Sequence, residues 1–354
     1  MRRHRLLLST LFLLLSCRLT GQAQAVSGDS MVFRVASYNV ENLFDCRHDT
    51  LHDDYEFLPD ATRHWTYSKY KKKLDNLARV ITALGGWTPP ALVALCEVEN
   101  DSVLTDLTRY SVLRNHDYRY ILTHSDDLRG IDVALLYQRA LFKPIHQQSL
   151  RVEKPRKNDR PTRDILYVSG LLLNGDTLDV LVGHFPSRRG GAKQSAPYRE
   201  KAALCIKAVA DSLFRIRKRA QILVMGDFND YPHSRLVRET LQAELSPLSP
   251  TLPDERKLYH LLARQAAEAK HTGSYKYQGA WQWLDHILVS GSLLLQDAPL
   301  HTSEQRAGVF APPFLLTEDP KYGGMQPFRT YYGMKYQGGY SDHLPMYAEF
   351  TLVY

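Results

Sequence analysis

Cysteine is scarce in this chain of 354 residues, which contains only Cys17, Cys46, Cys96 and Cys205. Cys17 falls in an N-terminal segment that we assign to export, so the other three permit at most one disulfide. No cysteines and histidines have the spacing of a structural zinc site. Cys96 ends an apolar run and Cys205 lies in a helical pattern, so we interpret both as buried thiols. The composition thus excludes disulfide-stabilised scaffolds and zinc-ribbon domains.

A hydrophobic run long enough to span a bilayer is also missing near the N-terminus. Residues 6–16 are apolar, but a spanning helix needs about 20 such residues. This run follows a basic start and precedes small residues at 22–25, which is the pattern of a secretory signal peptide. We therefore predict a signal peptide over residues 1–25 and an exported product, periplasmic or secreted. Residues 14–17 also resemble a lipoprotein box, so a lipid anchor on Cys17 is the alternative.

An excess of one charge is absent once the signal peptide is set aside. Four of the 45 basic residues and none of the 38 acidic ones lie before residue 26, which leaves 41 basic against 38 acidic residues. The sequence pI of about 9.1 therefore overstates the basic character of the mature chain. Net charge alone does not indicate a nucleic-acid partner.

Linkers, internal repeats and low-complexity segments are lacking as well. We therefore predict one domain over residues 26–354, a size at which large sheet proteins often remain single. Apolar residues spaced like a helix occur at 74–84, before Gly85-Gly86, and from Pro197 to Leu213. Weaker patterns suggest two further helices, at 235–243 and 258–267.

Short apolar runs typical of buried strands lie between these helices. The clearest are at 33–38, 92–96, 133–137, 166–173, 178–183, 222–225, 287–290 and 346–353. Strands interleaved with helices, in a chain large enough for two sheets, predict an α/β layered sandwich. Residues 45–69 and 295–340 have no regular pattern, and long irregular segments in a compact domain are usually functional or mobile. We expect both to shape a substrate cleft.

Polar side chains stand where several of these strands end. The clusters are Asn39-Val40-Glu41-Asn42, Glu97, residues 129–132, His184, Gly226-Asp227-Phe228-Asn229, Asp285-His286 and Ser341-Asp342-His343-Leu344-Pro345. Separate strands that deliver carboxylates, amides and imidazoles to one sheet edge provide what metal-assisted phosphate-ester hydrolysis requires. That reaction needs a cation on the phosphoryl oxygens, an oriented water and a stabilised leaving oxygen.

Hard oxygen ligands favour Mg²⁺, which keeps several waters and takes one or two carboxylates. Glu97 and Asp342 are suited to this role, and Asn39 or Asn42 can add an amide. A lone glutamate after a strand is more often a solvated strand end. Convergence with the other clusters is therefore what supports a metal site here.

The Gly226–Asn229 cluster is more specific. If the backbone is extended, Asp227 and Asn229 occupy alternate positions and point to the same side, where they can orient water and phosphate. The alternative is an Asx-type turn, which these residue types also favour. His184 and His343 can donate protons or hydrogen bonds near a developing charge.

Asp285 is suited to orient one of these imidazoles, as in other acid–histidine pairs. Its neighbour His286 has the opposite strand parity. We therefore expect His286 to pack away from the site.

Together these motifs resemble the endonuclease/exonuclease/phosphatase superfamily, which includes deoxyribonuclease I, apurinic endonucleases, sphingomyelinases and inositol-phosphate 5-phosphatases. The match runs in order from about Phe33 to Tyr354 and rests on the set Ser37-Tyr38-Asn39-Val40-Glu41-Asn42, Glu97, His184, Gly226-Asp227-Phe228-Asn229, Leu284-Asp285-His286 and Ser341-Asp342-His343-Leu344-Pro345. Each motif alone is weak, but the ordered series is specific. The resemblance implies a four-layer α/β/β/α sandwich of two packed, mostly antiparallel sheets, with the site at one edge.

Roles for individual residues also follow from the resemblance. It implies Mg²⁺ or Mn²⁺ held chiefly by Glu97, with help from Asn39 or Asp342. Asp227 and Asn229 would handle the attacking water and the phosphate. His343 would pair with Asp285, and His184 would be the second histidine. The acid that partners His184 in deoxyribonuclease I has no clear counterpart, and Asp126 and Asp132 are the candidates.

Three arginines are candidate phosphate ligands. Arg129 and Arg163 extend the match towards a bacterial exported subset, and a planar guanidinium suits phosphate. A surface ion pair with Asp132 or Asp164 is the alternative for these two. Arg188 follows His184 in a Gly-rich turn, so we expect it at the rim of the site. We interpret residues 71–73, all lysine, as the solvent-exposed side of a helix.

The sequence leaves three classes of function open. We predict an exported Mg²⁺-dependent phosphodiesterase, a nuclease acting on DNA or RNA, as a monomer without an obligate protein partner. A phospholipid or small phosphoester hydrolase on the same site is the second class, because Tyr331, Tyr332, Tyr336 and Tyr340 can touch a lipid surface or stack on bases. A non-catalytic binding protein on this fold is the third. Inositol phosphatases are disfavoured, because their motifs Trp-x-Gly-Asp-x-Asn-Tyr and Pro-x-Trp-Cys-Asp differ from Val224-Met225-Gly226-Asp227-Phe228-Asn229 and Trp283-Leu284-Asp285 in this chain.

Overall fold

A computed structural model describes residues 28–247, 251–269 and 271–354 of the chain. The predicted signal peptide, with Cys17, lies outside the described residues. No helix within these ranges is long and apolar enough to cross a membrane.

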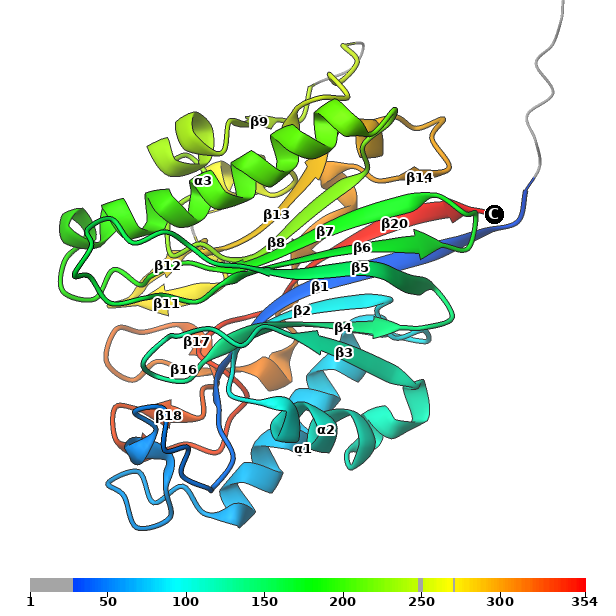
Figure 1. Ribbon diagram of the computed structural model, residues 1–354. Helices are drawn as coiled ribbons and strands as arrows, with labels where there is room; N and C mark the ends of the chain where they lie inside the picture. Colours follow the sequence, from blue (N-terminus) through cyan, green and yellow to red (C-terminus); the bar gives the residue numbers. More distant parts are fainter. Residues whose placement is uncertain (1–27, 248–250, 270) are drawn as a thin grey trace, which may run out of the picture.

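Two large sheets form the centre of the molecule (Figure 1). The first consists, in spatial order, of β14 (Leu300–His301), β20 (Met346–Val353), β1 (Ser30–Leu43), β2 (Leu92–Val98), β4 (Asp132–Gln138) and β3 (Tyr118–Leu122), with β15 (Ala307–Val309) also paired to β20. The second consists of β5 (Phe142–Leu150), β6 (Ile165–Leu172), β7 (Thr177–His184), β8 (Ile222–Asp227), β13 (Asp285–Ser290), β10 (Leu258–His260) and β9 (Ala243–Leu245). Most neighbouring strands are antiparallel, but β1–β2, β7–β8 and β9–β10 are parallel.

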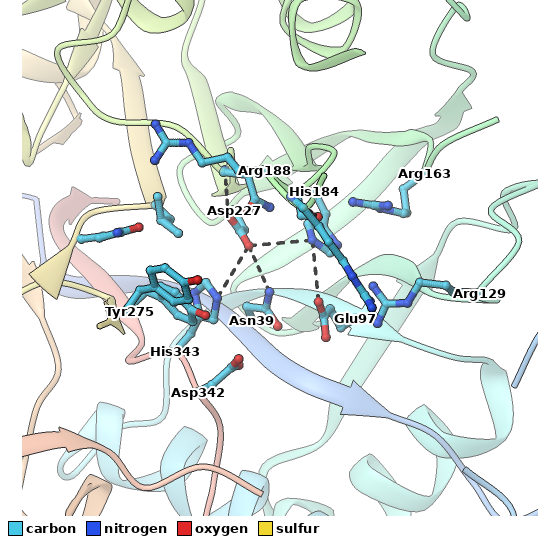
Figure 2. A pocket seen from close by; sticks show the side chains of 16 residues that line it. Asn39, Glu97, Arg129, Arg163, His184, Arg188, Asp227, Tyr275, Asp342 and His343 are labelled. Carbon is cyan, nitrogen blue, oxygen red and sulfur yellow. Dashed lines mark hydrogen bonds and ion pairs between the residues drawn. The ribbon is translucent and has the colours of Figure 1, made fainter. Parts of the chain in front are cut away.

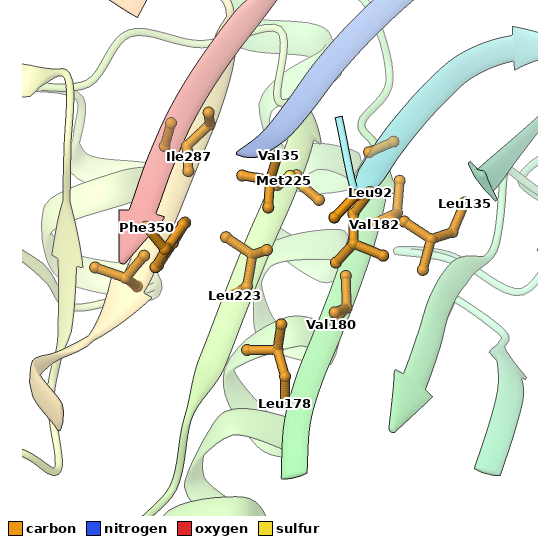
Figure 3. Packing of buried hydrophobic residues seen from close by; sticks show 14 of the residues in the cluster. Val35, Leu92, Leu135, Leu178, Val180, Val182, Leu223, Met225, Ile287 and Phe350 are labelled. Atoms are coloured by element: carbon orange, nitrogen blue, oxygen red, sulfur yellow. The ribbon is translucent and has the colours of Figure 1, made fainter. Parts of the chain in front are cut away.

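Helices cover the outer face of each sheet, which gives the predicted four layers (Figure 1). The helix α3 (Ala192–Ile216) lies over the second sheet, whereas α1 (Tyr67–Gly85) and α2 (Asp101–Arg109) lie against the first. Both faces of the sheets are thus buried, which explains why their strands read as continuous apolar runs. In β1, for example, Phe33 and Val35 pack between the sheets, while Ala36 and Tyr38 pack towards α1. Figure 3 shows the buried cluster between the sheets, to which Leu223 and Val180 contribute from the second sheet and Phe350 from the first.

Three two-stranded hairpins supplement the sandwich. They are β11–β12 (Tyr275–Tyr277 and Ala280–Gln282), β16–β17 (Leu316–Glu318 and Met325–Pro327) and β18–β19 (Tyr331–Tyr332 and Lys335–Tyr336). The last two hairpins lie in the segment 295–340 that has no regular sequence pattern. They extend the sandwich beyond the sheet edge at which β1, β2, β7 and β8 end (Figure 1).

Two of the predicted helices are wrong in part. Residues 236–240 form a single π-helical turn, η3 (Leu236–Thr240), and Ala243 already begins strand β9. Residues 258–260 are strand β10, and only the short helix α4 (Ala263–Glu268) follows. Tertiary pairing with β13 therefore overrides a weak local helical pattern.

Smaller differences concern single residues. Helix α3 begins five residues before Pro197, which lies inside it. Of the cysteines, Cys96 is buried as expected, whereas Cys46 and Cys205 are only half-buried, and all three are free thiols.

Lys73 also departs from expectation, because it is a buried cation that connects α1 to the C-terminal segment. Its side chain is 1% exposed, and its ammonium donates to Thr330 Oγ1 at 2.6 Å and to the Tyr340 carbonyl at 2.7 Å. The Glu41 carboxylate accepts the backbone N–H groups of Thr330 and Tyr331, at 2.6 and 3.0 Å. Burial raises the pKa of Glu41 to about 7, and the positive charge of Lys73 opposes that rise. A charged network therefore fixes this loop beneath the sheet edge.

We predict that Lys73→Met lowers the free energy of unfolding by roughly 3 kcal/mol, because two buried acceptors lose their charged donor. Urea unfolding followed by circular dichroism measures this change. Lys72→Met, at the exposed neighbouring position on α1, is the control and should change stability by less than about 0.5 kcal/mol. Equal stability of the two variants would contradict the structural role of Lys73.

Candidate active site

A cavity of about 660 Å³ opens at the edge where the two sheets meet (Figure 2). Strands β1 and β2 are parallel, as are β7 and β8, so the carboxyl ends within each pair lie at the same edge. The lining residues are Asn39, Glu97, Arg129, Arg163, His184, Ser187, Arg188, Arg189, Asp227, Asn229, Tyr275, Tyr277, Gln282, Leu284, Asp342 and His343. Ten of the eleven candidate site residues thus line one cavity, and Asp285 lies directly behind His343.

Glu97 reaches the cavity through an irregularity in β2. The register of β2 with β4 shifts between Cys96 and Val98, and Glu97 adopts the left-handed conformation with φ 67°. A bulge of this kind re-aims one side chain at a strand end. One carboxylate oxygen of Glu97 accepts the Asn42 backbone N–H at 2.9 Å, and the other lies 3.9 Å from His184 Nε2.

The oxygen donors expected of a divalent-cation site are present. The half-buried Asp342 carboxylate forms no hydrogen bond or ion pair with any residue in the described ranges. Asn39 is more engaged, because its oxygen accepts the Glu41 N–H and its nitrogen donates to Asp227. Glu97 and Asp342 therefore fit a hard cation such as Mg²⁺ better than Asn39 does.

Asp227, Asp285 and His343 form the one cluster of metal-ligand type found among the described residues. His343 Nδ1 lies 2.7 Å from Asp285 Oδ2, and His343 Nε2 lies 3.8 Å from Asp227 Oδ2. Burial opposes a positive charge on His343, but the neighbouring carboxylates, led by Asp285, raise its pKa to about 10. An imidazolium has no free lone pair, so we assign this cluster to proton transfer and not to metal binding.

The pKa of the buried Asp227 carboxyl is raised to about 7. Burial, and then the charge of Asp285, raise the pKa of the Asp227 carboxyl well above its ordinary value, while His343 lowers it. Its Oδ2 accepts the Asn39 amide at 3.1 Å and its Oδ1 accepts the Asn229 backbone N–H at 2.8 Å. A carboxyl with a raised pKa is suited to exchange protons near neutral pH.

The Gly226–Asn229 segment is an Asx-type turn and not extended backbone. Asn229 has φ 51° and its backbone donates to the Asp227 side chain, while its amide donates to the Phe185 carbonyl at 3.0 Å. Both side chains still line the cavity. Gly226 has φ 142°, and a Cβ there would lie 1.8 Å from the Gly183 carbonyl oxygen. Only glycine fits before Asp227.

His184 is neutral and has no acidic partner of the expected kind. Asp132 bonds to Thr123 and Ser125, and Asp126 bonds to Arg151, so both sequence candidates are wrong. The Nδ1 atom of His184 is buried without a hydrogen-bond partner in the described chain. Burial, followed by nearby cationic groups including Arg163 and Arg129, holds the pKa of His184 well below its ordinary value.

The three candidate arginines all reach the cavity (Figure 2). Arg163 is buried and pairs with Asp127 at 3.2 Å, not with Asp132 or Asp164 on the surface. Arg129 donates to the Asn42 side chain. Arg188 lies 3.8 Å from Asp230 and stacks over the Tyr231 ring at 4.3 Å. The Nε atoms of Arg163 and Arg188 are buried without a hydrogen-bond partner in the described ranges, and both side chains line the cavity, where their positive charge favours an anion.

Sequence reasoning missed part of the lining. Tyr275 lies against His343, with ring centroids 4.8 Å apart, and Tyr277, Gln282 and Leu284 accompany it. The alternation of Tyr275 and Tyr277 shortly before Asp285 was the available signal. His286 lies outside the cavity and bonds to His260.

The fold is thus an α/β/β/α sandwich with acids, histidines and arginines around one cavity at its edge. A family model described as the Endonuclease/Exonuclease/phosphatase family matches residues 34–351. The chain belongs to this family, whose members are phosphoester hydrolases, typically dependent on a divalent metal. No curated protein matches the chain.

Several solved structures share the fold at low identity. An endonuclease/exonuclease/phosphatase family protein from Bacteroides thetaiotaomicron has a TM-score of 0.55 and 15% identity, covering 92% of this chain and 99% of its own. TDP2 from D. rerio, complexed with a single strand DNA product, has a TM-score of 0.52 and 15% identity, with 90% and 98% covered. A mannosyl-6-phosphatase from Bacteroides thetaiotaomicron has a TM-score of 0.51 and 15% identity, with 90% and 99% covered.

We predict that Asp285→Asn lowers the pKa of His343 from about 10 by more than one unit, because burial then opposes the imidazolium without its nearest counter-charge. NMR titration of the histidine ring protons in EDTA measures the shift, with His343→Gln assigning the signal. Asp164→Asn is the control and should leave this pKa unchanged, because the Asp164 side chain bonds to Ser149 and does not line the cavity. A His343 that still titrates near 10 in Asp285→Asn would contradict the pairing.

Proposed function

We propose that this chain is a Mg²⁺-dependent phosphodiesterase that hydrolyses nucleic acid. The observation that supports it most is the convergence on one cavity of metal-type carboxylates, an acid–histidine pair and three arginine side chains. Each group matches one demand of phosphate-ester hydrolysis. The complete set favours an enzyme over a binding protein on the same fold.

Each part of the site has a role in this proposal. Arg129, Arg163 and Arg188 bind the phosphate oxygens, since guanidinium forks match that geometry. Glu97 and Asp342, with Asn39 beside them, would hold a divalent cation, which would neutralise charge on the phosphoryl oxygens. These groups position the phosphorus atom above Asp227.

Proton transfer falls to the buried acids and histidines. Asp227 accepts the proton of the attacking water as the new phosphorus–oxygen bond forms, and Asn229 fixes the orientation of Asp227. The His343 imidazolium, held by Asp285, donates a hydrogen bond to the phosphoryl oxygen, and the leaving oxygen takes a proton from solvent water as its bond to phosphorus breaks. Neutral His184 contacts the phosphate from the side of the cavity opposite His343.

The cleft favours a polymeric diester because it continues on both sides of the catalytic cavity. On one side Arg129 and Arg189 also line a second cavity of about 350 Å³, together with Phe44, Phe57 and Arg63. On the other side Tyr275 and Tyr277 also line a hollow of about 260 Å³. A small phosphomonoester needs neither extension. The structural likeness to TDP2 is compatible with this choice, while the mannosyl-6-phosphatase represents the alternative reaction.

The test is turnover of plasmid DNA, RNA, sphingomyelin and a sugar phosphate by the purified protein, with Mg²⁺ or with EDTA. We expect cleavage of nucleic acid that EDTA abolishes and that weakens steeply as salt rises. Turnover confined to the sugar phosphate or to sphingomyelin would overturn the nuclease proposal.

Site variants test the assigned roles. Asp227→Asn and His343→Ala should each lower kcat by about 10²- to 10⁴-fold without unfolding the protein. Glu97→Gln should weaken activation by Mg²⁺ in a titration of rate against metal. His146→Ala, at an exposed position on β5, is the matched control and should keep full activity. Normal turnover by Asp227→Asn would remove that residue from the mechanism.

Export is a separate part of the proposal and rests on the sequence pattern of residues 1–25. Mass spectrometry of the protein purified from its own host should give a chain that begins at Val26. A lipid-modified chain that begins at Cys17 would establish the anchored form instead.

A further inference from the structure

The hollow beside the catalytic cavity has a composition of its own. Its volume is about 260 Å³, and its lining is Tyr275, Lys276, Tyr277, Gln278, Asp319, Lys321, Tyr322, Gln326, Arg329, Tyr332 and Gly333. We call it the tyrosine hollow. Tyr275 and Tyr277 belong to both spaces, so the hollow and the catalytic cavity are continuous.

The wall shared by the two spaces is rigid. Tyr275 and Tyr277 are alternate residues of β11 and point to the same face. Between them, Lys276 pairs with Asp319 at 2.9 Å, and both side chains are 4% exposed. The Lys276 ammonium also donates to the Gly323 carbonyl at 2.8 Å. This buried pair fastens the β11–β12 hairpin to the β16–β17 turn.

The opposite wall carries the positive charge. The guanidinium carbon of Arg329 lies 6.0 Å from the Tyr275 ring centroid and 5.6 Å from the Tyr332 ring centroid. Its Nε atom is buried and has no hydrogen-bond partner in the described chain. An anionic ligand that crosses from the catalytic cavity therefore meets a cation placed between two aromatic rings.

The exposed tyrosines of the hollow differ from those that pack into the fold. Tyr331 and Tyr340 are buried and Tyr336 is half-buried against them, so they serve the core. Tyr277, Tyr322 and Tyr332 are 53%, 43% and 46% exposed. These three come from three separate segments, yet they line the same hollow.

We propose that the tyrosine hollow is a nucleobase subsite, which stacks the base of the nucleotide next to the scissile phosphate in a single-stranded segment. This inference rests on the proposed nuclease function and adds a substrate class to it. Aromatic side chains stack any base through its flat face, and nearby arginine adds a cation–π contribution. The hollow is smaller than the pockets that hold whole small molecules, which fits one flat ring system.

Charge and polarity favour a base over a lipid chain. Lys276, Lys321, Arg329, Asp319 and two glutamines share the lining with the tyrosines. A polar heterocycle can satisfy such groups, whereas an acyl chain leaves them desolvated without partners.

The decisive experiment compares two single-stranded DNA oligonucleotides of equal length, one with all its bases and one with an abasic backbone. Both carry the same phosphates, so they differ only in what can stack. For Tyr322→Ala and Tyr332→Ala, which line the hollow and not the catalytic cavity, kcat/KM on the base-containing strand should fall about 5- to 150-fold relative to the abasic strand. Activity on the abasic strand should remain that of the wild type, because neither tyrosine belongs to the catalytic machinery.

Two control variants separate stacking from structure. Tyr332→Phe keeps the ring and should keep the preference for bases. Tyr110→Ala removes a tyrosine that is 67% exposed and lines neither space, and it should change nothing. Equal losses of kcat/KM on both strands in Tyr332→Ala would overturn the subsite. A loss of activity confined to sphingomyelin vesicles would also overturn it and would assign the hollow to contact with a lipid surface.

Binding in EDTA distinguishes failure of this inference from failure of the proposed function. If the wild type cleaves neither strand, the nuclease proposal fails. Fluorescence anisotropy of the labelled strands then still tests the hollow. The subsite is supported if the wild type binds the base-containing strand more tightly than the abasic strand and Tyr332→Ala removes this difference. Equal binding of the two strands by the wild type would overturn it.

Discussion

The hydrogen bond from the Asn39 amide to the Asp227 carboxylate, 3.1 Å long, connects the two sheets at the edge where the site forms. Asn39 ends the regular part of β1 in the first sheet, and Asp227 ends β8 in the second. The bond is buried, so loss of either partner would leave a polar group without water or protein to satisfy it. The Asn39 backbone is held in turn by Ser341, whose hydroxyl donates to its carbonyl at 2.7 Å. The positions of Asp342 and His343 thereby depend on the same contact.

The two histidines on either side of this contact have neighbours of opposite charge. Asp285 lies behind His343 and stabilises its positive charge, while burial, and then the charges of Arg163 and Arg129, hold the pKa of His184 low on the other side. Two histidines of one cavity therefore carry different charges at the same pH. Their difference follows from neighbours and not from burial, because both are buried.

Much of this arrangement was readable from the sequence. Apolar runs with polar ends predicted the strands, and the parallel pairs β1–β2 and β7–β8 explain why those ends converge. Features that depend on distant parts of the chain could not be predicted from the sequence. The left-handed conformation of Glu97 depends on a bulge set by pairing with β4, and no local pattern announces it. The burial of Lys73 depends on contacts with Thr330 and Tyr340, more than 250 positions away along the chain. A run of three lysines reads as exposed until those partners are known.

The exposure of the C-terminal tyrosines could not be predicted from the sequence either. Composition singled out an aromatic segment at 331–340, but packing decides which rings remain free, and only Tyr332 of the four is exposed. The rings that join it come from β11 and the turn after β16. Three distant segments thus complete one surface that no single stretch of sequence describes.

The order of the strands has a consequence for folding. Strand β1 lies between β2 and β20, although β1 and β20 are far apart along the chain. Pairing between strands so distant in sequence is slow to form, because it closes a long loop before any contact compensates. Asp342 and His343 immediately precede β20, so they reach the cavity only when β20 has paired with β1. Completion of the cavity is therefore a late step of folding.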